Sequence, residues 1–215
     1  MLSKRLNKLV DCLPQCNTLA DVGCDHGYVG IQALERGVAR QVIFVDISQE
    51  CLNKAAENCP AALKSNASFV CRNGLGNISA DTAAICGMGG LEIISILDGA
   101  DTLPKTLVLQ PMRNVSEVRA RLIKDYKITL DEKIYDGKFY DVIVAELSNE
   151  RQSLTELELQ FGLSNISYPT QDFADYLLWE QTKLTNILNA CSSQEVRSKL
   201  VLVEQALEII RRKQI

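Results

Sequence analysis

A shortage of metal ligands is the first feature of this sequence. It contains one histidine, His26, and none of its eight cysteines forms a Cys-x-x-Cys pair, so a zinc site has few candidate ligands. A secreted disulfide scaffold is usually a shorter chain that is richer in cysteine for its length. We therefore expect no metal, and we interpret the cysteines as small buried hydrophobic residues in a reducing compartment.

Long apolar runs are also missing. No stretch approaches the roughly 18 residues that a membrane-spanning helix needs. The N-terminus carries Lys4, Arg5 and Lys8 on helical spacing and lacks a signal-peptide pattern. We expect a cytoplasmic protein without membrane contact. The formal net charge of −4 argues against a protein that coats nucleic acid non-specifically, although it leaves room for a local basic patch.

What the chain does contain, over its first 150 residues, is an alternation of strand and helix patterns. Strands are expected at 18–22, 41–45, 67–71, 82–86 and 106–109, with helices at 1–13, 28–36, 49–58, 91–97 and 115–126. Strands separated by helical segments predict a parallel sheet, because parallel pairing requires crossovers of this length. Two further strands, 127–135 and 139–145, are joined through Asp136-Gly137, a strong hairpin signal that predicts one antiparallel edge strand.

After residue 150 the strand pattern stops, and two long helical patterns follow at 173–190 and 193–212. In the second, Val196, Leu200, Val203, Leu207 and Ile210 form a heptad seam. A short polar turn between the two helices predicts an antiparallel helical hairpin. We expect a doubly wound α/β domain over 1–150 and a helical domain over 151–215. The sequence leaves open whether the protein is a monomer or a weak dimer joined through these helices.

Glycine, acidic and amide residues gather where the expected strands end. The groups are 21–27, Asp46, Asn73-Gly74, Gly87–Gly90 and Gln110-Pro111. An open parallel sheet binds ligands beyond the carboxyl ends of its strands. These groups therefore predict one binding site beside the first strand.

The first of these loops, DVGCDHG at 21–27, favours one cofactor class. Gly23 and Gly27 permit a tight turn and the close approach of a ligand. A dinucleotide-binding fingerprint would need glycine where this chain has Asp25 and Tyr28, and an anionic side chain there is unfavourable to a pyrophosphate. The loop instead suits the cationic ammonium and sulfonium groups of S-adenosylmethionine. We predict cofactor contacts from Gly23, Cys24, Asp25 and Gly27.

Asp46 adds recognition of an adenosine. It ends the second expected strand, where an acidic group can receive both hydroxyls of a ribose; capping of the next helix is the alternative role. Asn73 could meet the adenine edge, although Asn-Gly is also simply a good turn sequence. The full set of further expected cofactor contacts is Asp46, Ile47, Asn73, Gly74, Gly87 and Met88.

Taken together, these motifs resemble a known family. DVGCDHGYVG at 21–30, Asp46, CGMGG at 86–90 and LQPM at 109–112 are similar to the bacterial tRNA (adenine-22-N1)-methyltransferases. The resemblance implies a Rossmann-like class I methyltransferase with a seven-stranded, mostly parallel sheet and a coiled-coil-like C-terminal domain. It also implies S-adenosylmethionine as the cofactor, tRNA as the partner, and methyl transfer to adenine N1 in the D-arm.

The segment after the fourth strand supports a ring nitrogen as the target. Many enzymes that methylate exocyclic amines carry Asn/Asp-Pro-Pro-aromatic there, and this chain has Gly87-Met88-Gly89-Gly90. The alternatives are a class I methyltransferase acting on another RNA, a protein or a small molecule, and a binding protein of this fold without catalysis.

Adenine N1 has an in-plane lone pair, so the reaction needs placement and tolerance of positive charge more than a strong base. Asp25 and His26 are the candidate catalytic residues. Asp25 could bind the cofactor's amino-acid end or stabilise developing charge, and His26 could orient the adenine or only fix the loop. We expect substrate contacts from Tyr28, Met88, Gln110, Pro111 and Met112, and phosphate contacts from Arg113, Arg119, Arg121 and Lys124. A charge run of this kind is most often a solvated surface.

Overall fold

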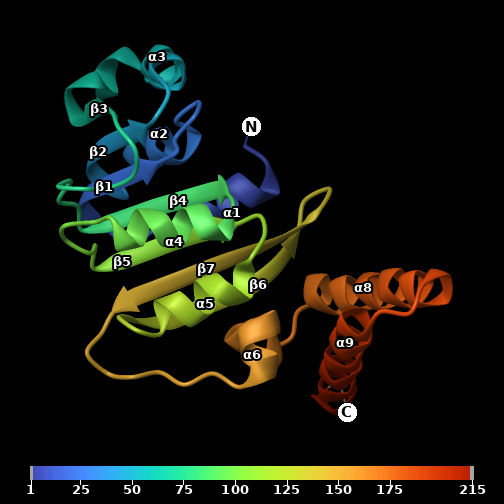
Figure 1. The fold of residues 1–215 in the computed structure, drawn as a ribbon. Helices are drawn as coiled ribbons and strands as arrows, with labels where there is room; N and C mark the ends of the chain where they lie inside the picture. Colours follow the sequence, from blue (N-terminus) through green and yellow to red (C-terminus); the bar gives the residue numbers. More distant parts are fainter. Residues whose placement is uncertain (1, 214–215) are drawn as a thin grey trace.

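A seven-stranded sheet with helices on both faces forms the first part of the molecule, and a group of helices follows it (Figure 1). The computed structural model describes residues 2–213, so Met1, within the expected first helix, lies outside the described residues. The elements, in chain order, are α1 (Lys4–Asp11), β1 (Cys16–Val22), α2 (Tyr28–Glu35), β2 (Ala39–Asp46), α3 (Gln49–Asn58), the 3₁₀ helix η1 (Ala61–Asn66), β3 (Ala67–Cys71), β4 (Thr82–Met88), α4 (Gly90–Asp98), β5 (Thr106–Pro111), α5 (Val115–Leu122), β6 (Tyr126–Tyr135), β7 (Phe139–Leu147), α6 (Glu156–Phe161), α7 (Leu163–Ser167), α8 (Gln171–Ala190) and α9 (Gln194–Lys213).

The strand order β3-β2-β1-β4-β5-β7-β6 confirms the Rossmann-like class I sheet. The chain moves from β1 to β2 and β3, and then returns to place β4 on the other side of β1, where Leu19 pairs with Thr82. The carboxyl ends of β1 and β4 therefore form the switch point at which ligands bind in sheets of this kind.

The expected position of the antiparallel strand was wrong. β7 is antiparallel to both β5 and β6 and lies between them, so the edge strand is β6. The reason is burial on both faces: residues 141–145 of β7 are buried without interruption, whereas β6 alternates between buried and exposed positions. The expected helix over 115–126 also ends early, at Leu122, because Tyr126 enters the core as the first residue of β6.

Two apolar layers hold the sheet. One contains α1, α2 and α3 packed against side chains such as Val42 and Phe44, and the other contains α4 and α5 packed against Ile85 and Leu109. Among residues 2–213, no helix combines the length and apolar character that crossing a bilayer requires. The cysteines are free, but only Cys24 and Cys59 are fully buried. Four others are half-buried and Cys71 and Cys191 are exposed, so the interpretation of all eight as buried residues was wrong.

The helical segment has a core of its own. The helices α8 and α9 confirm the two long helical patterns, and Val203, Leu207 and Ile210 of the heptad seam are buried. They pack with Phe161, Phe173, Leu177 and Leu184. Two short helices, α6 and α7, were not predicted. A capping box, in which Thr155 and Glu158 each satisfy the other's backbone N–H, starts α6.

Candidate cofactor and substrate site

The loop after β1 lies against the ends of β2 and β4. Gly23 has φ +68°, and a Cβ at this position would lie 2.3 Å from Cε of Met88. Its N–H donates to the carbonyl of Val45 at 2.7 Å. Only glycine accepts this conformation beside Met88 without strain. The loop therefore presents bare backbone to the space beyond β1.

Asp21 supports this loop from below, a role that was not assigned to it from the sequence. Its side chain is buried at the end of β1, and Oδ2 accepts the N–H of Gly30 at 2.9 Å. The bond ties the strand to the first turns of α2. Burial raises the pKa of Asp21 to about 7.

Asp46 joins two of the predicted segments. Its Oδ1 accepts the N–H of Ser48 at 2.9 Å, and its Oδ2 accepts the N–H of Asp25 at 3.2 Å. The residue that caps α3 is Ser48, whose Oγ accepts the N–H of Cys51. Each carboxylate oxygen keeps a further lone pair for a ligand. Asp46 is therefore held in a fixed orientation with acceptor capacity remaining.

A cavity of about 620 Å³ opens at these strand ends. Six predicted cofactor residues line it: Gly23, Asp46, Ile47, Asn73, Gly74 and Met88. Cys24, Asp25, Gly27 and Gly87 do not: Cys24 is buried beneath the loop, and Gly27 is the N-cap of α2. Sequence reasoning missed Arg72 and Glu92, which also line the cavity. Arg72 directly precedes the predicted turn Asn73-Gly74, and Glu92 follows the glycine-rich segment 87–90, but nothing in their spacing marked them.

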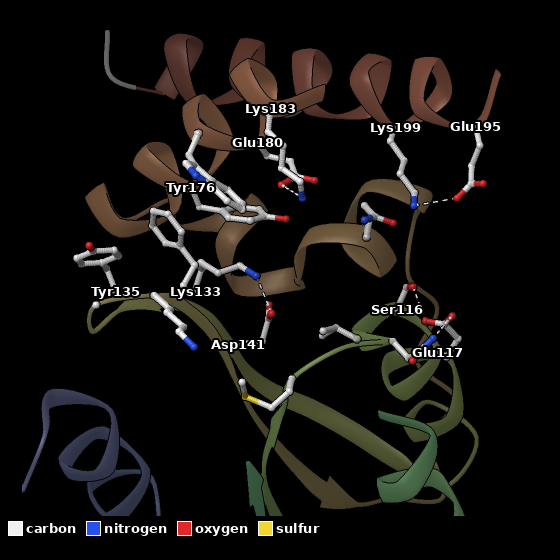
Figure 2. Close-up of a pocket in the computed structure, with 18 residues that line it drawn as sticks. Ser116, Glu117, Lys133, Tyr135, Asp141, Tyr176, Glu180, Lys183, Glu195 and Lys199 are labelled. Atoms are coloured by element: carbon white, nitrogen blue, oxygen red, sulfur yellow. Dashed lines mark hydrogen bonds and ion pairs between the residues drawn. The ribbon is translucent and has the colours of Figure 1, made fainter. Parts of the chain in front are cut away.

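A second, larger cavity of about 940 Å³ lies between the β6–β7 hairpin, the start of α5 and the helices α8 and α9 (Figure 2). Figure 2 shows Tyr135 and Lys133 of the hairpin below Tyr176 and Lys183 of α8. Met112 lines this cavity, and its N–H donates to the carbonyl of Met88 at 2.9 Å. Met88 lines the first cavity, so this hydrogen bond links the walls of the two cavities.

Gly90 allows the loop after β5 to lie close to the start of α4. A Cβ there would lie 2.5 Å from the carbonyl oxygens of both Arg113 and Asn114, and the Gly90 N–H donates to Arg113 O at 2.9 Å. The loop after β5 can approach α4 this closely only because residue 90 has no side chain. Arg113 is exposed and lies 3.4 Å from Glu92 of the first cavity.

The residues predicted to contact the substrate separate into two groups. Met112 is half exposed and lines the larger cavity. Gln110 is completely buried: its Oε1 accepts from Arg5 at 2.7 Å, and its Nε2 lies 3.3 Å from Pro111 O. The amide has no exposed group for a base edge, so that prediction for Gln110 is contradicted. Pro111 is likewise buried within β5.

The predicted phosphate-binding patch does not exist as one surface. Arg119 is 0% exposed and donates to Asp131 at 2.7 Å and to Asp141 at 3.0 Å. Arg121 is held between Asp98 and Asp125, each at 2.6 Å. Lys124 is exposed, but it follows the end of α5, which runs away from the site. Only Arg113 is left at the carboxyl end of β5.

Asp25, His26 and Tyr28 lie on the outer face of the loop. Asp25 adopts φ 45°, and its Oδ2 lies 3.6 Å from Nε2 of His26. The His26 and Tyr28 rings stack with centroids 5.4 Å apart. All three side chains have large exposed fractions and are open to a substrate arriving from solvent. Among the residues that the structure describes, no three histidine, cysteine or carboxylate side chains gather as metal ligands.

Comparison with known proteins identifies the family to which this arrangement belongs. Residues 2–143 match the model of the methyltransferase domain. The chain is 33% identical over 171 residues to the tRNA (adenine(22)-N(1))-methyltransferase of Bacillus subtilis, covering 75% of this chain and 72% of the relative. The chain belongs to the tRNA (adenine(22)-N(1))-methyltransferase family.

Two solved structures are similar to this methyltransferase over nearly its whole length, including the helical segment. Streptococcus pneumoniae Sp1610, in complex with S-adenosyl-L-methionine, is 27% identical with a TM-score of 0.87, over 96% of this chain and 100% of that one. TrmK of M. capricolum, in complex with S-adenosyl-homocysteine, is 25% identical with a TM-score of 0.85, over 98% and 99%.

Proposed function

We propose that this methyltransferase transfers the methyl group of S-adenosylmethionine to N1 of adenine 22 in tRNA, in the cytoplasm. The observation that carries the proposal is the hydrogen bond from Met112 to Met88, which places side by side the walls of two cavities, one lined by predicted cofactor residues and one between the hairpin and the helices. Methyl transfer needs this juxtaposition, because cofactor and nucleophile must approach each other in line. The family to which the chain belongs supports the choice of substrate.

The first cavity fits S-adenosylmethionine. Asp46 offers oriented carboxylate oxygens for a ribose diol, and Gly23 presents open backbone. The Nε of Arg72 is buried without a hydrogen-bond partner among residues 2–213, so it has a donor left for a ligand. When bound, the cofactor supplies an electrophilic methyl group on a sulfonium.

The chain's own residues then have three tasks. Met88 and Met112 provide apolar contact to the reacting groups. The loop after β5 fixes the position of Met112 relative to Met88. Asp25, Asp46 and Glu92 place negative charge around a reaction whose product base is cationic. The stacked His26 and Tyr28 rings offer an exposed flat surface on the same loop. No group has to remove a proton before N1 attacks.

Incubation of the protein with labelled S-adenosylmethionine and an unmodified tRNA transcript tests this function. We expect label in 1-methyladenosine at position 22 and none in a transcript with guanine there. Label at any other nucleoside, or no transfer to tRNA, would contradict the proposed substrate. A parallel titration should give binding of S-adenosylmethionine and none of NAD; tight NAD binding would contradict the proposed cofactor.

Asp25 is proposed to stabilise positive charge, and Asp25→Asn tests this role. Asparagine tolerates the left-handed conformation of residue 25, so the variant removes the charge while retaining the loop. We expect kcat/KM for tRNA methylation to fall by at least about tenfold. The control is Glu146→Gln, an exposed carboxylate at the other end of the strands, opposite Thr106 at the start of β5. An Asp25→Asn variant with full activity would remove Asp25 from the mechanism.

A further inference from the structure

The larger cavity carries an aromatic surface that methyl transfer itself does not use. Trp179 of α8 lines it and is 51% exposed, and Tyr135 at the hairpin turn is 48% exposed. Phe139 lies between them, with ring centroids 5.0 Å from Tyr135 and 5.8 Å from Trp179. Large aromatic rings left open to a cavity are more typical of a binding surface than of a folding core.

The charges in this cavity determine what kind of ligand it suits. Its lining contains four lysines and four carboxylates, so the cavity as a whole does not attract anions over long range. Two of the lysines are close to the aromatic surface: Lys183 Nζ lies 4.9 Å from the Trp179 ring centroid, and Lys138 is exposed at the hairpin turn. Flat apolar faces with a few local cations match a nucleobase attached to its phosphate.

The wall of this cavity is bonded to the wall of the proposed site of methyl transfer. Met112 lines the larger cavity, and the backbone bond from Met112 to Met88 joins it to the cofactor cavity. A polynucleotide whose adenine reaches Met88 would therefore have a neighbouring nucleotide between the hairpin and α8.

We propose that this cavity binds an unpaired base next to the target adenine, with the base stacked on Trp179 and with Lys183 and Lys138 near the phosphates. The inference rests on the proposed function, because it takes RNA as the substrate. It adds a second recognition site, in which the helical segment selects RNA with an unstacked nucleotide beside the target.

Trp179 is the only tryptophan of the chain, so its fluorescence reports directly on this site. Unmodified tRNA titrated into the full chain should give a saturable loss of tryptophan emission, because a stacked base quenches the indole. A fully paired RNA duplex of the same length should give little loss. Equal quenching by the duplex would overturn base stacking. A change in emission with protein concentration alone, without RNA, would show that a second copy of the chain covers Trp179 and would also overturn it.

Kinetics of variants provide the second measurement. Trp179→Ala should raise the KM for tRNA about tenfold with little change in kcat, and Trp179→Phe should restore most of the loss, since phenylalanine still stacks. The matched control is Leu178→Ala, because Leu178 is 50% exposed on the same helix but does not line the cavity. A wild-type KM in Trp179→Ala, or an equal rise in Leu178→Ala, would overturn the proposal.

The two proposals fail in different ways. If the wild-type protein does not methylate tRNA, the proposed function fails whatever Trp179 does. If the wild-type protein methylates adenine 22 and the Trp179 variants retain normal KM and emission, only the second site fails. Affinity for S-adenosylmethionine should be unchanged in every Trp179 variant, because Trp179 is not part of the cofactor cavity.

Discussion

Asp21 is a carboxyl group that folding removes from water. Burial raises its pKa from 3.8 to about 7, although the N–H of Gly30 partly offsets this. Between these two pH values the folded protein keeps a proton that the unfolded chain releases. The unfolding free energy contributed by Asp21 is therefore highest below about pH 4 and falls as the pH rises toward 7.

Asp21→Asn should remove this dependence. The amide oxygen can still accept from Gly30, and it cannot ionise, so the variant should gain stability relative to the wild type as pH rises from 5 to 8. We expect a relative gain on the order of a few kcal/mol, measured by urea unfolding at both pH values. Asp101→Asn, at an exposed carboxyl, is the control and should show no such gain. A difference between Asp21→Asn and wild type that is the same at both pH values would contradict the account.

Arg119 shows what the sequence could not reveal about individual residues. It stands in a run with Arg113, Arg121 and Lys124, and their spacing in the sequence predicts the same role, phosphate contact, for all four. In the fold Arg119 faces the core, where Asp131 and Asp141 lie 2.7 and 3.0 Å away. Both carboxylates come from β6 and β7, more than ten residues later in the chain. Such a partnership exists only after the hairpin has packed, so no local pattern predicts it.

The edge strand β6 is protected by side chains of the segment that follows the sheet. Its outward N–H groups at Ile128, Asp131, Lys133 and Tyr135 would otherwise be open to pairing with another strand. Each of them donates to a side chain at 2.8 to 2.9 Å. Ile128 donates to Gln152 Oε1 and Asp131 to Ser164 Oγ, and Lys133 donates to Asn165 Oδ1 and Tyr135 to Asp172 Oδ2. The outward N–H groups belong to an even-numbered residue before the bulge between Ile128 and Leu130 and to odd-numbered residues after it. Side chains of the segment 152–172 thus accept the hydrogen bonds that the backbone of an eighth strand would otherwise accept.

Asn165 is the most deeply buried of these partners, and Asn165→Ala tests its contribution. Its Oδ1 accepts from Lys133 N at 2.9 Å, and its Nδ2 donates to Phe161 O at 2.7 Å. The substitution leaves two buried backbone groups unsatisfied and should lower the unfolding free energy by about 2–4 kcal/mol. Denaturant unfolding measures the loss. Asn189→Ala, at an exposed position on α8, should change it by less than about 0.5 kcal/mol. Equal effects of the two substitutions would show that the edge bonds contribute little.

The elements that the sequence predicts correctly have strong local periodicity. The strands ending at Val22 and Asp46, and the seam through Val203 and Leu207, follow from spacing alone. The clustering of Gly23, Asp46, Asn73 and Met88 at one cavity follows from the rule that parallel strands end at one edge. The helices α6 and α7 were missed because they have only six and five residues and depend on tertiary packing, α6 against α5 and α7 against β6. The domain boundary at 150 stays a prediction.

In the whole molecule, the Arg119 cluster connects the sheet to the helices. Arg119 belongs to α5, its carboxylate partners to β6 and β7, and its Nη1 also donates to the carbonyls of Leu159 and Gln160 in α6 at 3.1 and 3.0 Å. Asp141 in addition holds Lys133 at 2.6 Å, and the Lys133 ammonium lies 4.2 Å from the Tyr176 ring centroid of α8. Arg119 therefore bonds to three segments besides its own helix, and Lys133 extends the cluster to α8.

Arg119→Met should weaken the attachment of the helices to the sheet more than it weakens the sheet itself. Removing one member of a buried ion cluster leaves carboxylates without a partner and typically costs about 3–5 kcal/mol. Urea unfolding followed by far-UV circular dichroism reports the whole chain, whereas Trp179 fluorescence reports α8 alone. The two transitions should coincide in the wild type, and in Arg119→Met the fluorescence transition should occur at lower urea.

Arg121→Met is the matched control for this experiment, because Arg121 also holds two carboxylates but only on α4 and just beyond α5. Its partners are largely exposed, so we expect a loss of about 1 kcal/mol and coincident transitions. If the two transitions of Arg119→Met also stay together and only shift, the cluster stabilises the molecule as one unit. In that case the helices do not unfold separately from the sheet. RNA binding in the cavity between the hairpin and the helices should then not depend on the Arg119 ion pairs.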